Sequence, residues 1–281
     1  MWVKREDLAH PLYGGNKVRK LSYLLPHVRS KGGELLTLGA IGSHHLLACS
    51  LHGQRFGVRT HALVFPQPST PHVEKNWAVL QREAASITKV PSELLLPFAA
   101  LDARQTIRDT TGRGPVFVWA GGSTPLGSLG WVEGGLEIGE QVRRGECPEP
   151  HAIYAALGSG GTVAGLLVGL QMAELRTQVI AVRVVDRPFA NRSIVLGLAR
   201  AMGKRLGVQV DARRLEVIHD EFGGGYGVET ARGREAMAEG VDAGLAIEPT
   251  YTAKTLAAAL DARESGRTVM FLDSLSSATM V

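Results

Sequence analysis

Short β-rich runs alternate with helix-compatible segments along the chain, and this alternation constrains the fold more than any other feature of the sequence. A strand, a short turn and a helix that repeat in this order are typical of parallel sheets with helices on both faces. We therefore predict an α/β protein with mostly parallel sheets. The predicted strands are WVKREDL near the start and residues 34–40, 60–65, 85–90, 115–122, 151–157, 179–186, 215–220 and 267–273, and the predicted helices are residues 43–56, 72–82, 98–112, 127–144, 161–174, 191–206, 228–239 and 252–264.

Length and charge exclude several classes of protein. The 281 residues suffice for one or two domains with a sizeable core. The net charge is +4, but the basic residues are spread among 27 acids, so nucleic-acid binding is not indicated. No apolar run approaches the ~20 residues that a bilayer crossing requires, and the start lacks the apolar core of a signal peptide. We expect a cytoplasmic protein without membrane contact.

Residues 158–165, GSGGTVAG, follow a predicted strand and open a predicted helix. Free N–H groups at the positive end of a helix, with the hydroxyls of Ser159 and Thr162, predict a phosphate site. The third glycine of the dinucleotide pattern G-x-G-x-x-G is replaced by Val163, although Asp186 stands where a ribose-binding acid would lie. A dinucleotide-dependent oxidoreductase stays an alternative. The loop has no lysine, which argues against a nucleoside triphosphate P-loop.

A lysine follows two glycines and an asparagine in GGNKVRKL, residues 14–21. An amine that attacks a carbonyl must lose its proton, and burial or nearby cations such as Arg19 and Lys20 lower the pKa of Lys17 towards that state. A lysine together with a separate phosphate site suggests an aldehyde that carries a phosphate. We therefore predict pyridoxal 5′-phosphate as the cofactor.

Several motifs together resemble the 1-aminocyclopropane-1-carboxylate deaminase and D-cysteine desulfhydrase family of fold-type-II pyridoxal phosphate enzymes, which are related to the tryptophan synthase β subunit. The resemblance implies a two-domain α/β architecture, with residues 1–19 and 128–281 in a larger cofactor-binding domain and residues 20–127 in a smaller inserted one. It also implies a homodimer that acts on a small amino acid. The motifs, in chain order, are WVKREDL, GGNKVRKL, GAIGSHH, GGSTPLGSLGWVEGGLEI, GSGGTVAG, GGGYG and EPTYTAK.

The resemblance also implies roles for individual residues. Lys17 looks like the Schiff-base lysine, and Ser43 like the serine near the substrate carboxylate. Tyr226 and Tyr251 match active-site tyrosines. The residues that resemble cofactor ligands are Asn16, Lys17, His44, Gly158, Ser159, Gly160, Gly161, Thr162, Thr252 and Ser274.

Three positions indicate the branch of the family and its divergence. Deaminases of the family carry a glutamate at the position of Thr252, and desulfhydrases carry a threonine at the position of Ser274. A hydroxyl at the pyridine nitrogen makes the ring a weaker electron sink than a carboxylate does, which favours β-elimination of D-cysteine over ring opening. His44 replaces the asparagine that usually faces the ring hydroxyl of the cofactor.

Other functions remain alternatives at this stage. Within the same class these are deamination of 1-aminocyclopropane-1-carboxylate and β-replacement. A diverged homologue that binds the cofactor or an amino acid without catalysis is another. His45, Cys49 and His52 share one predicted helix face, but we predict no metal site because no further ligand is evident.

Overall fold

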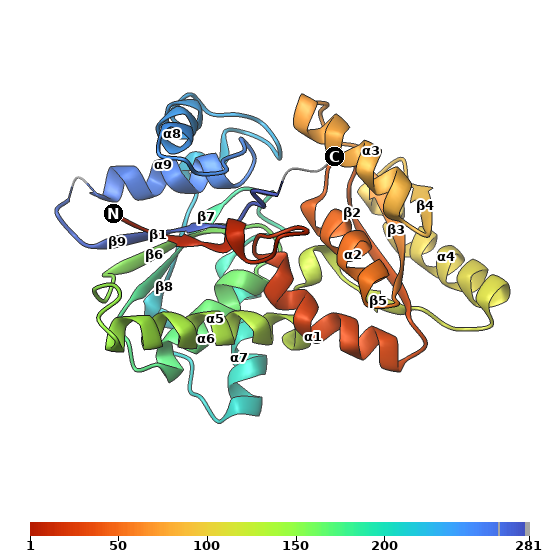
Figure 1. Cartoon of the computed structure of the whole chain (residues 1–281), viewed down its shortest axis with the longest axis horizontal. Helices are drawn as coiled ribbons and strands as arrows, with labels where there is room; N and C mark the ends of the chain where they lie inside the picture. The colour runs from red at the N-terminus through yellow and green to blue at the C-terminus, as the bar shows by residue number, and fades with distance from the viewer. Residues whose placement is uncertain (264, 279–281) are drawn as a thin grey trace.

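The computed structural model describes residues 1–263 and 265–278. Within them the strands form two sheets, one of five strands in the order β1-β9-β6-β7-β8 and one of four strands in the order β4-β3-β2-β5. Figure 1 shows the two sheets in separate lobes, with helix α1 running below the junction between them. The predicted α/β class with two mostly parallel sheets is confirmed, since every strand pairing recorded in both sheets is parallel.

The elements follow the predicted alternation closely. The strands are β1 (Trp2–Arg5), β2 (Glu34–Ala40), β3 (Arg59–Phe65), β4 (Ser86–Lys89), β5 (Val116–Val118), β6 (Ala152–Leu157), β7 (Gln178–Arg183), β8 (Leu215–Ile218) and β9 (Val269–Asp273). The α-helices are α1 (Lys17–Ser30), α2 (His44–Arg55), α3 (Pro71–Glu83), α4 (Leu96–Thr111), α5 (Pro125–Arg143), α6 (Gly161–Met172), α7 (Arg192–Leu206), α8 (Ala231–Asp242) and α9 (Thr252–Arg263).

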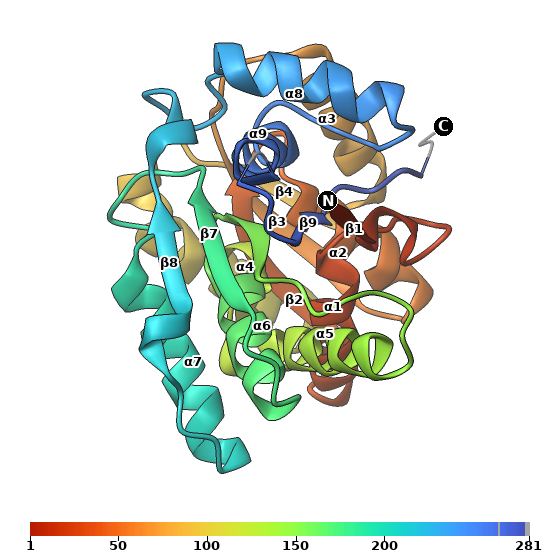
Figure 2. The ribbon, with the colours of Figure 1, turned by 90° about the vertical axis from the view of Figure 1, so that its left-hand side faces the viewer.

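Helices cover both faces of each sheet. Helices α5, α6 and α7 lie on one face of the five-stranded sheet, and α8 and α9 lie on the other (Figure 2). The residues of α6 from Gly161 to Leu170 are all buried because the helix is apolar all round and packs between α5, α7 and the sheet. The smaller sheet packs against α1, α2 and α3 on one face and α4 on the other.

The first predicted strand, WVKREDL, ends at Arg5, and Glu6–Leu8 form a short 3-10 helix. Two further segments differ from the prediction. Residues 17–30, for which we predicted no helix, form α1 despite Pro26 in its interior. The helix exists because Leu21, Leu24, Leu25 and Val28 form a buried stripe against α2, a tertiary contact that outweighs the local cost of proline. Strand β5 ends at Val118, before the predicted residue 122, since Gly121 and Gly122 turn the chain with positive φ angles of 68° and 65°.

In the described residues no helix is both long and apolar enough to span a bilayer.

Candidate active site

Lys17 is the first residue of α1, and its amine lies against the loop that precedes it. Its Nζ donates to Asn16 Oδ1 at 2.8 Å, and Asn16 Nδ2 donates to Thr162 Oγ1 at 3.0 Å. The amide of Asn16 therefore joins the lysine to the predicted phosphate loop, 146 residues away in the chain. Burial lowers the pKa of Lys17 to about 8, against the opposing effects of Cys49 and Glu248.

The predicted phosphate loop, residues 158–162, leads from β6 into α6. Gly160 has a φ of 87°, a conformation that glycine adopts without a Cβ penalty. A second loop, residues 121–124, packs against it: Ser123 Oγ lies 2.7 Å from Ser159 Oγ and accepts from the Gly161 N–H at 3.0 Å. Polar groups of both loops thus meet at the N-terminus of α6, where the helix dipole favours an anion.

Lys20 approaches the same point from α1. Its side chain is 2 % exposed, and its Nζ donates to the Gly121 carbonyl at 2.9 Å and to Ser123 Oγ at 3.1 Å. A Cβ built on Gly161 would lie 2.9 Å from that Nζ. Burial and the neighbouring Lys17 hold the pKa of Lys20 well below its usual range. Among the described residues no acidic side chain pairs with this buried amine, and such an amine fits the dianionic phosphate of a cofactor.

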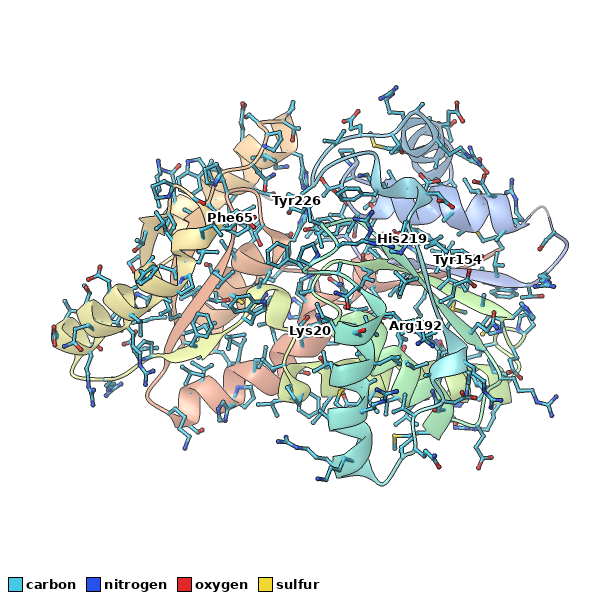
Figure 3. The ribbon with its side chains drawn as sticks, turned by 180° about the vertical axis from the view of Figure 1, so that it is seen from behind. Lys20, Phe65, Tyr154, Arg192, His219 and Tyr226 are labelled. Atoms are coloured by element: carbon cyan, nitrogen blue, oxygen red, sulfur yellow. The ribbon has the colours of Figure 1, made fainter. Side chains whose placement is uncertain are left out.

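Two tyrosines close another side of the site. Tyr226 Oη and Tyr251 Oη are 2.8 Å apart, and a Cβ on Gly158 would lie 3.5 Å from the Tyr251 ring. Burial raises the pKa of both phenols, that of Tyr226 to about 12, so both remain neutral. Figure 3 shows Tyr226 and Lys20 in the middle of the molecule, where the two lobes meet.

Thr252 opens α9 directly after Tyr251, and its hydroxyl bonds to Glu248. Thr252 Oγ1 accepts from the Glu248 N–H at 2.8 Å. The buried Glu248 carboxylate in turn accepts from the N–H groups of Thr250, Tyr251 and Thr252 at 2.7 to 2.9 Å. A carboxylate at the positive end of a helix is stabilised there, and this cap fixes the backbone that carries Tyr251.

Ser43 and His44 mark the start of α2. Ser43 Oγ accepts from the Leu46 N–H at 3.4 Å, and so acts as the N-cap of the helix. The His44 ring lies edge-on to the Tyr251 ring at 6.3 Å between centroids. Both His44 nitrogens have partners, Tyr13 and His72, so a bond from His44 to a cofactor oxygen requires one of them to be displaced.

Ser274 follows β9, and its carbonyl accepts from the Asn16 N–H at 3.1 Å. This contact ties the last strand to the lysine loop. The structure therefore brings the sequence-predicted residues of GGNK, GSGGT, GSHH, GGGYG, EPTYT and the segment after β9 to one junction between the lobes.

The sequence analysis weighed Lys20 only as a cation near Lys17, and it gave Glu248 no role. Lys20 shares a helix face with Lys17 at the i, i+3 spacing, a pattern that was present in the sequence. Glu248 precedes a helix start, where an acid caps free N–H groups, and this too was a usable signal.

The residues weighed as metal ligands contact one another or neighbouring protein groups. Cys49 Sγ lies 3.6 Å from His45 Nδ1, His45 Nε2 lies 2.9 Å from Thr37 Oγ1, and His52 Nε2 lies 2.8 Å from the Tyr13 carbonyl. In residues 1–263 and 265–278 no group of three potential metal ligands is found.

Lys17 is a buried amine of lowered pKa that is linked to the N-terminus of α6, where an anion is favoured. This arrangement between two parallel sheets defines a lysine-centred enzyme site of the kind that holds a phosphorylated aldehyde. Comparison with known proteins gives the family. The family model described as pyridoxal-phosphate dependent enzyme matches residues 1–272. The chain belongs to this family, so pyridoxal phosphate is its cofactor, as predicted.

Individual relatives are similar over most of the chain. Nocardicin C-9′ epimerase of Nocardia uniformis subsp. tsuyamanensis is 33 % identical over 260 residues, which cover 90 % of this chain and 78 % of the relative. D-cysteine desulfhydrase of Salmonella paratyphi B is 30 % identical over 267 residues, with 93 % and 80 % coverage. A solved structure described as an ACC deaminase homologue superposes with a TM-score of 0.84 at 25 % identity, covering 97 % of this chain and 83 % of that one.

The family match also bears on the alternative of a dinucleotide-dependent oxidoreductase. Asp186, the residue weighed as its ribose ligand, is exposed. With the family established, pyridoxal phosphate is the cofactor, and the dinucleotide hypothesis loses its support.

Proposed function

We propose that the protein is a lyase that acts on a small amino acid, most like D-cysteine, by β-elimination to pyruvate, ammonia and sulfide. The observation that carries the proposal is the bridge from Lys17 through Asn16 to Thr162, which couples a reactive amine to a phosphate site. Its relatives include a D-cysteine desulfhydrase at 30 % identity. Thr252 and Ser274, in place of the residues typical of deaminases, favour this reaction over ring opening.

We assign the cofactor contacts as follows. The Gly158–Thr162 loop and Lys20 would hold the phosphate, Thr252 would face the pyridine nitrogen, and Ser274 would lie beside it. Asn16 and His44 would contact the ring or its substituents. When bound, pyridoxal phosphate withdraws electrons from the α carbon of the amino acid.

Lys17 has two tasks in this proposal. Its neutral amine holds the aldehyde of the cofactor until an amino acid displaces it, and it then removes the proton from the α carbon of the substrate. A pKa of about 8 leaves a useful neutral fraction near physiological pH. Ser43, at the start of α2, would receive the substrate carboxylate, and the neutral phenols of Tyr226 and Tyr251 would contact the substrate.

Replacement of Lys20 with methionine is expected to weaken binding of pyridoxal phosphate by about 10- to 100-fold, because a charge-assisted bond from a buried amine to phosphate is lost. Pyridoxal, which lacks the phosphate, should bind both proteins equally. Titration of the cofactor absorbance measures both affinities. The matched control is Lys31→Met at the exposed end of the same helix, and equal loss for pyridoxal and its phosphate would contradict the assignment.

We propose that residues 1–19 with 128–281 and residues 20–127 form the two domains, with the cofactor in the cleft between them. Support comes from the sheets: one draws on residues 34–118, the other on residues 2–5 and 152–273.

We further propose a cytoplasmic homodimer. Leu94, Phe98 and Leu101 are 84 %, 70 % and 67 % exposed at and beside the start of α4, and so much apolar surface favours a second copy. Sedimentation should give the mass of a dimer, and the double variant Phe98→Glu, Leu101→Glu should sediment as a monomer. Cell fractionation tests the compartment.

An epimerase is the second candidate, because the relative at 33 % identity carries that name. Elimination and epimerisation both begin with removal of the α proton, so the products distinguish them. The purified holoenzyme is mixed separately with D-cysteine, L-cysteine and 1-aminocyclopropane-1-carboxylate. Sulfide and pyruvate from D-cysteine support the lyase, whereas inversion at the α carbon without sulfide supports the epimerase. Turnover of the cyclopropane alone would refute the preference for elimination.

A further inference from the structure

A serine, a histidine and a glutamate from three neighbouring strands form a hydrogen-bonded row in the smaller lobe. Ser86 Oγ, at the start of β4, lies 2.7 Å from Nδ1 of His61 in β3. His61 Nε2 lies 2.8 Å from Oε2 of Glu34, the first residue of β2. The row lies towards the amino ends of these strands, whereas Ser43 and the phosphate loop follow the carboxyl ends of β2 and β6. The row is therefore separate from the lysine site.

The register of the smaller sheet brings the three side chains to one face. His61 is paired with Ser86 across β3 and β4, and with Leu36 across β2 and β3. Glu34 stands two residues before Leu36 and shares its face, because side chains alternate along a strand. Leu36 packs in the apolar cluster under α4, so the row lies on the face of the sheet that α4 covers.

The hydroxyl of the row is open to solvent, and its other two members are buried. Ser86 is exposed on β4, the outermost strand of its sheet (Figure 1). His61 and Glu34 are 5 % and 4 % exposed. A reagent in solution can therefore reach the hydroxyl, while the imidazole and the carboxylate behind it are shielded from water.

The partners of His61 determine which of its ring nitrogens carries the proton. A carboxylate only accepts, so Nε2 donates to Glu34. In a neutral imidazole the other nitrogen is then an acceptor, and Nδ1 accepts from the Ser86 hydroxyl. Arg59 Nη1 lies 3.6 Å from the second carboxylate oxygen, Glu34 Oε1, and fixes the orientation of the carboxylate. Hydroxyl, imidazole and carboxylate follow one another as in serine triads, with the two ring nitrogens exchanged.

The edge of the sheet supplies backbone donors next to the hydroxyl. Among the described residues β4 pairs with β3 on one side only. Half of the N–H groups of such an edge strand point to its open side. A backbone N–H beside a serine nucleophile stabilises the oxygen of an acyl group under attack, because negative charge develops on that oxygen.

We propose that Ser86, His61 and Glu34 form a second reactive site, at which Ser86 takes the acyl group of an activated ester. His61 Nδ1 accepts the hydroxyl proton as Ser86 Oγ forms a bond to the acyl carbon. The bond from this carbon to the leaving oxygen then breaks, and His61 gives the proton to the leaving alcohol. Water hydrolyses the acyl-serine by the same route, so the three side chains end unchanged.

This site is independent of the proposed lyase reaction, because it uses neither the lysine site nor the cofactor. Ser86 is the nucleophile and His61 the base, whereas Glu34 acts through His61 and is a positioning residue. The tests use the holoenzyme and consist of one measurement with a reagent and one without.

The first measurement is the rate at which a biotinylated fluorophosphonate labels each serine, located by mass spectrometry. The serine oxygen displaces fluoride from the reagent and forms a stable ester, which stands for the acyl ester. We expect Ser86 to be labelled at least about 100-fold faster than Ser69. Ser69 is the matched control, since it is exposed and its hydroxyl donates to the Glu74 carboxylate at 2.8 Å. Equal labelling of the two serines overturns the site.

The variant His61→Gln should lower the labelling rate of Ser86 by about 100-fold or more, because the general base is lost. Labelling of Ser69 should stay unchanged, and circular dichroism checks that the variant is folded. A folded His61→Gln protein that labels Ser86 as fast as before overturns the site.

The second measurement is nitrogen NMR of the protein labelled with ¹⁵N-histidine at neutral pH, with His61→Gln to assign the signals. The site predicts one proton on His61, bound to Nε2. Glu34→Gln should move it to Nδ1, because Arg59 only donates and so holds the amide oxygen, which leaves the amide nitrogen to donate to Nε2. A charged imidazolium in the unaltered protein, or a tautomer that Glu34→Gln does not change, overturns the site.

Discussion

Replacement of Lys17 with alanine is expected to abolish the absorbance band of lysine-bound pyridoxal phosphate at about 410–430 nm and to lower turnover by at least about three orders of magnitude. The loss is large because one amine both holds the aldehyde and moves the α proton. The phosphate should still bind, since Lys20 and the Gly158–Thr162 loop are intact. Absorbance spectra and cofactor affinity measured on the same sample separate the two effects.

Two further variants make this result specific. Lys17→Arg keeps the positive charge but supplies no amine nucleophile, so it should behave as alanine does in the spectrum. Lys204→Ala, at an exposed position in α7, should keep both the band and the turnover. A band that survives in both Lys17 variants would refute the assignment of Lys17 and point to a different lysine.

Replacement of Asp273 with asparagine is expected to stabilise the protein in a pH-dependent manner. Asp273, at the end of β9, is 0 % exposed. In the described residues neither of its carboxyl oxygens has a hydrogen-bond partner, and the nearby Leu275 N–H favours the charged form of the carboxyl. Burial and then the nearby Asp7 raise its pKa to about 7, against Leu275 and Arg5.

The direction of this pH dependence follows from the coupling between proton binding and folding. An acid whose pKa is higher in the folded than in the unfolded state favours folding at low pH, and this contribution is lost as the pH rises through the folded pKa. A shift of about three units corresponds to at most about 4 kcal/mol, because one unit is about 1.4 kcal/mol. The variant should gain about 1 kcal/mol near pH 4.5 and up to about 4 kcal/mol near pH 8. Denaturant unfolding at both pH values measures the difference.

The control for this experiment is Asp242→Asn, an exposed carboxyl at the end of α8, which should change the free energy of unfolding by less than about 0.5 kcal/mol at either pH. A gain for Asp273→Asn that is equal at both pH values would show that its carboxyl titrates normally in the folded state.

The fold class was predictable because it depends on local signals. Alternating strand and helix patterns identified eight later strands and their helices to within a few residues, since buried strands and capped helices carry their own composition and periodicity. The strand, glycine turn and helix around residues 158–162 were predictable for the same reason, because they are consecutive in the chain. Their role in binding phosphate remains a prediction. The roles assigned to Ser43, Tyr226, Tyr251, Thr252 and Ser274 remain predictions.

Tertiary structure alone decided what surrounds these motifs. The buried stripe of α1 has helical spacing in the sequence, a signal that our prediction missed, but only the packing of α1 brings Lys20 to Gly121, 101 residues away. His44 was expected to face the cofactor, yet its nitrogens are held by Tyr13 and His72 from two other segments. Sequence determined which segments become strands, helices and glycine turns, because those depend on neighbours in the chain. Sheet order and packing determined which side chains meet, because those contacts join residues that lie far apart in the chain and leave no pattern in the sequence around them.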